Sequence, residues 1–121
     1  MSASPFLENR NRIIENEIGF VILDAFPVSE GHCLVIPKRV YADYFESTYE
    51  EIIGLQKLVI ETKSYLDQNY NPDGYNVGIN CGEVSGQTVP HVHIHVIPRY
   101  AGDMENPRGG VRGVIPSKQK Y

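Results

Sequence analysis

Cysteine is scarce in this chain of 121 residues, which holds only Cys33 and Cys81. These two do not form a Cys-x-x-Cys pair and are too few for a disulfide framework, so a reducing, cytoplasmic setting is expected. Long apolar runs are missing too, since a run such as residues 18–23 is far shorter than the roughly 20 residues that span a bilayer. The N-terminus lacks the basic start and apolar stretch of a secretory signal. We therefore predict a protein that makes no use of a membrane.

An excess of positive charge is also missing, because the net charge is −4. Residues 1–97 hold 13 Asp/Glu against 6 Lys/Arg, whereas residues 98–121 hold 5 Lys/Arg against 2 Asp/Glu. An acidic body is unsuited to sequence-independent binding of a nucleic-acid backbone, so no nucleic-acid partner is expected. The irregular basic tail, residues 99–121, is either a solvated terminus or a segment that meets an anionic ligand through Arg108 or Arg112.

The spacing of apolar residues predicts a single α+β domain over residues 1–121. After Thr48 they recur every three or four positions, as in an amphipathic helix, and Thr48 with Glu51 matches a capping box. The remaining apolar segments are short and joined by tight turns, which favours a largely antiparallel sheet with the helix across one face. Residues 1–9 are expected to be a loose lead-in. The predicted strands are residues 13–15, 18–24, 32–36, 75–80 and 91–97.

Three of the four histidines alternate with apolar residues in the run His91-Val92-His93-Ile94-His95. In an extended strand alternate side chains share a face, so the three imidazoles are predicted on one face and the apolar residues on the other. Imidazoles buried without partners would cost free energy. The histidine face is therefore expected to open on a ligand site.

Three interpretations of this face stay open. The histidines could be structural residues without a role. They could bind a metal, but the outer two are roughly 13 Å apart along a strand, so a third ligand would have to come from His32, Asp24 or Cys81. They could also form a nucleophilic site, because neutral imidazole is a competent nucleophile near pH 7. The last interpretation is favoured, since the middle residue His93 has a helper on each side.

Residues 86–97, GQTVPHVHIHVI, resemble the signature of the histidine triad (HIT) family, His-φ-His-φ-His-φ-φ. Residues 20–24, the loop to Gly31-His32 and residues 79–82 also match, so the resemblance covers roughly residues 10–100. It implies a sheet of about five antiparallel strands with one long and one short helix, paired as a homodimer. It also implies hydrolysis or transfer at the α-phosphate of a nucleotide through a covalent nucleotidyl-histidine.

The resemblance implies a role for each catalytic candidate. His93 would be the attacking residue, with His91 and His95 on its flanks and His32 supporting the cluster from the neighbouring strand. No cofactor would be required, although a divalent cation could be bound with a polyphosphate substrate. No Cys-x-x-Cys lies upstream, so the structural zinc of some family members is not expected.

The resemblance also implies a binding site for a purine nucleotide. Asp24 would hold the ribose hydroxyls, a task for which a carboxylate that accepts two hydroxyl donors is well suited. Asn80, Gln87 and Thr88 would place amide and hydroxyl donors at the phosphate, where a transferring phosphoryl group needs preorganised donors.

The branch of the family is less sharply defined by the sequence. Residues 97–99, Ile-Pro-Arg, with Gly102-Asp103 resemble the branch that splits dinucleoside polyphosphates, which is favoured here. Asn80 and Thr88 are closer to the branch that hydrolyses nucleoside phosphoramidates, which is the first alternative. A nucleotide-binding or interaction module without turnover is the second alternative, and a transition-metal carrier is a third class.

Overall fold

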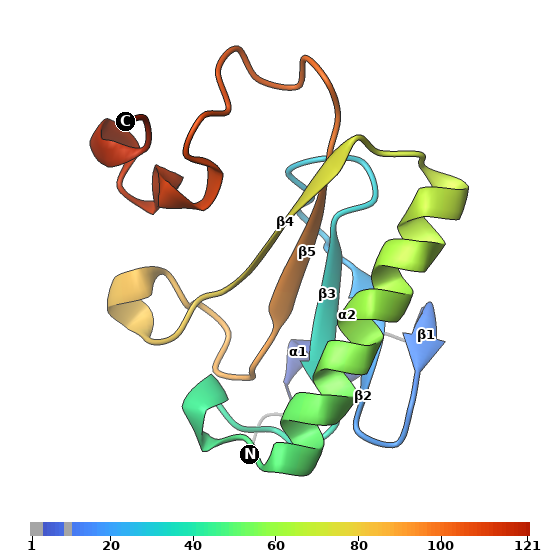
Figure 1. Cartoon of the computed structure of the whole chain (residues 1–121). Coiled ribbons are helices and arrows are strands. Elements are labelled where there is room, and N and C mark those ends of the chain that lie inside the picture. Colours follow the sequence, from blue (N-terminus) through green and yellow to red (C-terminus); the bar gives the residue numbers. More distant parts are fainter. Residues whose placement is uncertain (1–3, 9–10) are drawn as a thin grey trace.

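The computed structural model of the chain describes residues 4–8 and 11–121. In this part of the chain five strands form one antiparallel sheet in the order β1-β2-β3-β5-β4. The long helix α2 lies across one face of it (Figure 1). The predicted α+β class, the five-stranded antiparallel sheet and the long and short helices are therefore confirmed. The strands are β1 (Ile14–Glu15), β2 (Gly19–Leu23), β3 (Cys33–Pro37), β4 (Gly74–Ile79) and β5 (Ile94–Arg99), and the α-helices are α1 (Pro5–Glu8) and α2 (Tyr49–Asn69).

Helix α2 begins at the predicted capping box. The Thr48 hydroxyl accepts a hydrogen bond from the Glu51 N–H at 3.1 Å, and the Glu51 carboxylate accepts one from the Thr48 N–H at 2.8 Å. Leu55, Leu58 and Leu66 on the inner face are fully buried against β2, β3 and β5. This burial fixes the sheet below the helix and leaves the opposite face of the sheet for a site.

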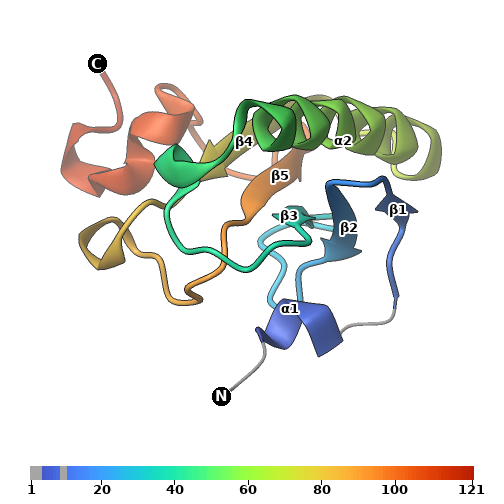
Figure 2. The ribbon, with the colours of Figure 1, turned by 90° about the horizontal axis from the view of Figure 1, so that it is seen from below.

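The opposite face is covered only in part, by the short helix α1, which lies on the side of the sheet away from α2 (Figure 2). Phe6 and Leu7 pack there against a buried cluster of β2 and β3 residues. The prediction of a loose lead-in over residues 1–9 therefore does not hold at Pro5–Glu8, because these two apolar side chains have a surface to bury against. Residues 1–3 and 9 lie outside the described residues.

Strand β5 begins at Ile94, three residues later than the predicted strand 91–97. The His91 N–H donates to the Val89 carbonyl at 2.8 Å, and the Val92 N–H donates to the Tyr41 carbonyl at 2.8 Å. These backbone groups bond to loops instead of a neighbouring strand. Only His95 of the triad therefore lies in the ladder, where it faces Leu34 of β3.

The C-terminal tail contains two short 3-10 helices, η3 (Gly110–Val114) and η4 (Pro116–Lys118). The Arg112 guanidinium joins them by donating to the carbonyls of Lys118 at 2.8 Å and Gln119 at 3.1 Å. Among the described residues no helix has both the length and the apolarity that crossing a membrane requires.

Candidate active site

A cleft of about 490 Å³ lies between α1, the loop after β2 and the start of β5. Six of the eight predicted site residues line it: Asp24, His32, Asn80, Thr88, His93 and His95. The other two, His91 and Gln87, have their side chains engaged elsewhere. The fold thus brings together His95 of β5, residues next to the ends of β2, β3, β4 and β5, and Thr88 of the loop before β5, which are up to 71 positions apart in the sequence.

His93 has a defined tautomer. Its Nδ1 lies 2.8 Å from the carbonyl oxygen of His91, and a carbonyl only accepts, so Nδ1 carries the proton. The lone pair is therefore on Nε2. The Phe6 ring packs edge-on against the imidazole, with 5.0 Å between ring centroids, and the side chain is buried. An imidazole held in this tautomer can present its Nε2 lone pair to an electrophile.

His91 does not line the cleft, although the resemblance implies that it flanks His93. Its ring is fully buried, with Nε2 2.7 Å from the Pro37 carbonyl and Nδ1 2.7 Å from the Ser4 hydroxyl. Because the carbonyl accepts, Nε2 is the donor and Nδ1 accepts from Ser4. His91 therefore fixes the backbone whose carbonyl orients His93. Sequence reasoning missed Ser4, which precedes His91 by 87 positions.

Replacing Ser4 by alanine is expected to destabilise the fold, because it leaves the buried Nδ1 of His91 without a donor. An unsatisfied buried acceptor costs about 1–3 kcal/mol. Urea denaturation of Ser4→Ala measures this loss, and Ser117→Ala, at an exposed serine of the tail, is the matched control. Equal stability of the two variants would contradict the assigned hydrogen bond.

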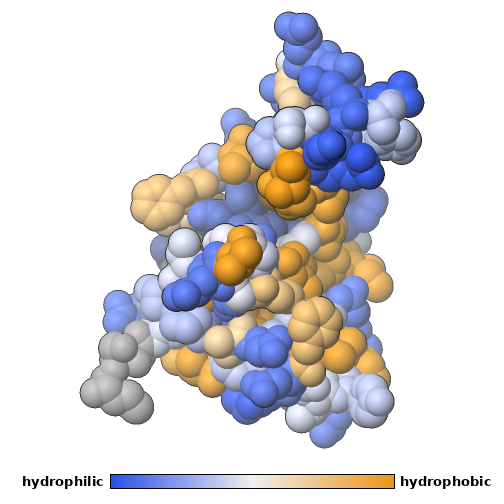
Figure 3. Space-filling model, turned by 90° about the vertical axis from the view of Figure 1, so that its left-hand side faces the viewer, coloured by the Kyte–Doolittle hydropathy of each residue, from blue (hydrophilic) through white to orange (hydrophobic). Residues whose placement is uncertain are grey.

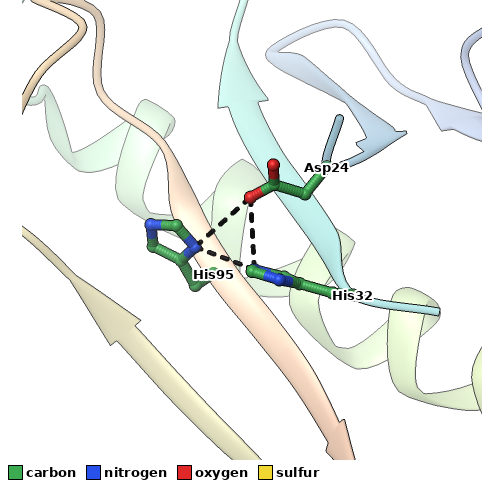
Figure 4. Close-up of side chains that lie close together, drawn as sticks. All are labelled: Asp24, His32 and His95. Carbon is green, nitrogen blue, oxygen red and sulfur yellow. Dashed lines mark hydrogen bonds and ion pairs between the residues drawn. The ribbon is translucent and has the colours of Figure 1, made fainter. Parts of the chain in front are cut away.

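His32, His95 and Asp24 form a second cluster in the cleft (Figure 4). The Val28 N–H lies 3.1 Å from Nδ1 of His32, so this nitrogen accepts and the proton is on Nε2. Nε2 of His32 then donates to Nδ1 of His95 at 2.9 Å. By the same reasoning the proton of His95 is on its Nε2. The Val28 backbone amide thus sets the tautomer of His32 directly and the tautomer of His95 through His32.

Burial sets the protonation state of this pair. Desolvation, with the neighbouring His93 and His32 adding to it and Asp24 opposing it, lowers the pKa of His95 to about 4. Desolvation also lowers the pKa of His32 from its ordinary value, again opposed by Asp24. Both imidazoles are therefore neutral at pH 7, and the Nε2–H of His95 is a hydrogen-bond donor without a second proton to give.

The same three side chains are the candidate for a metal site within the described residues, because their ligand atoms lie within 4.8 Å of one another. A metal-bound histidine normally donates the proton of its other nitrogen to an acceptor. His32 instead accepts the Val28 N–H at Nδ1, so a metal at its Nε2 would require an imidazolate. The arrangement of Asp24, His32 and His95 favours a series of hydrogen bonds over a set of metal ligands. Cys81 is not part of this cluster.

Three of the four predicted substrate-binding residues line the cleft, and the fourth, Gln87, does not. Asp24 uses one carboxylate oxygen to accept the Phe26 N–H at 2.8 Å, and its other oxygen lies 3.4 Å from Nε2 of His32. Asn80 and Thr88 line the cleft. Gln87 does not: its amide accepts the Gly82 N–H and donates to the Ala42 carbonyl, both within 2.9 Å. Gln87 therefore holds the loop that carries Thr88, instead of presenting an amide to a phosphate as expected.

The neutral histidines predict that stability falls in acid. His32, His91 and His95 all have a pKa lowered mainly by burial, so the unfolded chain binds protons at a higher pH than the folded one. Stability is then complete above about pH 7 and is lost as the pH falls toward 4. His95 alone accounts for about 3 kcal/mol, since its pKa drops to about 4.

Urea denaturation at pH 7 and pH 4.5 measures this loss in the free energy of unfolding. The variant His95→Gln keeps a polar side chain but removes one titrating group, so the difference between the two pH values should shrink. A stability that is flat over this range would contradict the neutral state of the cluster.

The fold and the site together define a small α+β protein in which a buried histidine, His93, lines a cleft. The family model of the HIT domain matches residues 8–102. The chain belongs to the HIT family.

Characterised and uncharacterised relatives agree with this assignment. The bis(5'-adenosyl)-triphosphatase of Dictyostelium discoideum is 38% identical over 103 residues, which are 84% of this chain and 69% of that protein. An uncharacterised 16.1 kDa HIT-like protein of Mycoplasma pneumoniae is 42% identical over 89 residues, 74% of this chain. The crystal structure of a HIT family protein from Bacillus anthracis superposes with a TM-score of 0.72 and 38% identity over 76% of this chain and 65% of the other. The chain spans 62% of the length of the Mycoplasma relative.

Proposed function

We propose that this protein is a nucleotide hydrolase that cleaves dinucleoside polyphosphates at the α-phosphate through a covalent intermediate on His93. The hydrogen bond from Nδ1 of His93 to the His91 carbonyl carries the proposal, because it leaves the Nε2 lone pair available beside a cleft of nucleotide size. The relative from Dictyostelium is named for the cleavage of such a substrate.

The reaction has two displacements. In the first, Nε2 of His93 forms a bond to the α-phosphorus, and the bond from that phosphorus to the bridging oxygen breaks. The oxygen leaves with the electron pair as the terminal phosphate oxygen of the departing nucleoside polyphosphate, stabilised by a hydrogen bond from the Nε2–H of His95. In the second, water attacks the same phosphorus, the P–N bond breaks, and a nucleoside monophosphate and a proton are released. Two inversions give overall retention at phosphorus.

The protonation of His95 supports a polyphosphate over a phosphoramidate. With its pKa lowered to about 4, this residue offers a hydrogen bond at pH 7 but no second proton. A departing phosphate is a stable anion and needs only the hydrogen bond, whereas a departing amine needs a full proton transfer. The phosphoramidase alternative keeps the support of Asn80 and Thr88, which line the same cleft.

The nucleotide is proposed to lie along the cleft, with its ribose at Asp24 and its phosphate at Asn80 and Thr88. Phe26 at the rim is 87% exposed, and an exposed aromatic ring beside a cleft is suited to stacking on a purine. A divalent cation would enter as part of the polyphosphate substrate.

A product survey tests the proposal. The protein is incubated with diadenosine triphosphate, diadenosine tetraphosphate and adenosine 5'-phosphoramidate, and the released nucleotides are identified by chromatography. We expect AMP and ADP from the triphosphate. Faster release of AMP from the phosphoramidate would favour the phosphoramidase alternative, and binding without any product would favour a nucleotide-binding module.

We also propose that the protein is a homodimer joined along the sheet. Strand β4 lies at one edge of the sheet, where its backbone groups are open to pairing. Val77 on this strand is exposed, which adds apolar surface for a second copy. Sedimentation at micromolar concentration should give twice the monomer mass of 13.6 kDa. A monomer over the whole concentration range would contradict this prediction.

A cytoplasmic location is the remaining part of the proposal. Cys33 and Cys81 are both free, and free thiols are typical of proteins that work in a reducing compartment.

A further inference from the structure

A second cleft, of about 410 Å³, adjoins the first on the same face of the sheet. Its walls come from β4 and β5 on one side and from η3 of the tail on the other. Four residues line both clefts: Val28, His32, Asn80 and His95. His95, the proposed donor to the leaving oxygen, therefore stands on the boundary between the two clefts.

The first residue of η3, Gly110, lies close to β4. A side-chain carbon added at Gly110 would lie 3.3 Å from Nδ2 of Asn76, which shows how closely η3 approaches the strand. The Arg112 guanidinium is bonded within the tail and lies 4.8 Å from the centre of the Tyr121 ring. Arg112 is therefore used to fold the tail, and the tail meets the second cleft through other residues.

Those residues are apolar. Val111 and Val114 of η3 line the second cleft and are 59% and 76% exposed. Figure 3 shows apolar atoms (orange) on this side of the molecule, below the hydrophilic segment (blue) at the top. The segment 98–121, which contains Val111 and Val114, has a net charge of +3. A ligand that combines a flat apolar group with negative charge fits a cleft with these walls in a segment of this charge.

We propose that the second cleft receives the departing nucleoside of a dinucleoside polyphosphate, with Val111 and Val114 against its base. This inference rests on the proposed function. If the α-phosphorus is attacked by His93 in the first cleft, the phosphate chain leaves past His95, and the second cleft is the space that lies beyond it. The tail is thereby a specificity element for the leaving group, and the first cleft holds the nucleotide that becomes bonded to His93.

Two substrates with the same attacked group separate the two clefts. Diadenosine triphosphate carries a nucleoside on its leaving side, whereas adenosine 5'-fluorophosphate loses only fluoride. In the double variant Val111→Asp/Val114→Asp we expect kcat/KM for diadenosine triphosphate to fall at least tenfold, because the carboxylates repel the anionic leaving group and remove the apolar wall. For adenosine 5'-fluorophosphate kcat/KM should stay within twofold. Both valines are exposed, so the fold tolerates the change.

The matched control is Val84→Asp, at a fully exposed valine of η2 (Glu83–Ser85) that lines neither cleft. It should leave both substrates unchanged. If the double variant affects both substrates equally, or neither, the second cleft does not hold the leaving nucleoside, while the proposed function stands. If the unaltered protein cleaves neither substrate, the proposed function fails, and the inference fails with it.

Discussion

Replacing His93 by alanine is expected to reduce turnover of diadenosine triphosphate by at least about 10⁴-fold, since loss of the nucleophile removes the covalent route altogether. The site offers no second imidazole in the same position: His91 has both ring nitrogens in buried hydrogen bonds, and Nδ1 of His95 accepts from His32. Nucleotide binding should be largely retained, because the proposed ribose and phosphate contacts come from Asp24, Asn80 and Thr88. Steady-state kinetics and calorimetric titration with AMP measure the two quantities separately.

The intermediate itself can be trapped. With substrate labelled at the α-phosphorus, rapid quenching should give protein carrying a label that is stable in alkali and released in acid, as expected of a phosphorus–nitrogen bond. The His93→Ala variant should carry none. A substrate that is chiral at the α-phosphorus gives an independent test: a product of inverted configuration would show direct attack by water and would exclude the histidine nucleophile.

The sheet, the helix and the main features of the cleft were within reach of the sequence. Alternation identifies His93 and His95 as side chains on the face away from α2, because Ile94 and Val96, which alternate with them, must enter the core. The capping box at Thr48 fixes the start of α2 from local chemistry alone. These features depend on residues that are close in sequence or on a simple periodicity, which is why a single sequence reveals them.

The contacts that set the histidine tautomers were out of reach. The Val28 N–H that determines the proton on His32 is a backbone group, and Ser4 reaches His91 from the position just before a helix of four residues. No periodicity predicts such pairings. Alternation also predicted His91 in the site. The Val92 N–H instead donates to the Tyr41 carbonyl, and this bond holds the segment away from the strand ladder.

Replacing His95 by alanine is expected to lower kcat for diadenosine triphosphate by about 10²–10³-fold, within the range for a group that assists a leaving atom without bonding to phosphorus. The two hydrogen bonds that run from the Val28 N–H through His32 to His95 place the proton of His95, and so its donor, on Nε2. Glutamine can place an amide N–H near that position, whereas asparagine places its amide near Nδ1. His95→Gln should therefore retain more activity than His95→Asn, and the opposite order would contradict the assigned tautomer.

The leaving group provides the sharper comparison for His95. Fluoride is a weak base and needs little help from a hydrogen bond. In His95→Ala, kcat for adenosine 5'-fluorophosphate should therefore fall by less than tenfold. The bridging oxygen of diadenosine triphosphate leaves as a more basic anion and depends more on the hydrogen bond, so kcat for this substrate should fall by at least one further order of magnitude. Asp24 lies 3.9 Å from Nδ1 of His95, but its proposed contact is with the ribose that both substrates share. Asp24→Asn should therefore weaken both substrates by a similar factor, chiefly through KM. A loss in His95→Ala that is equal for the two leaving groups would mean that this histidine positions the nucleotide instead of assisting the departure.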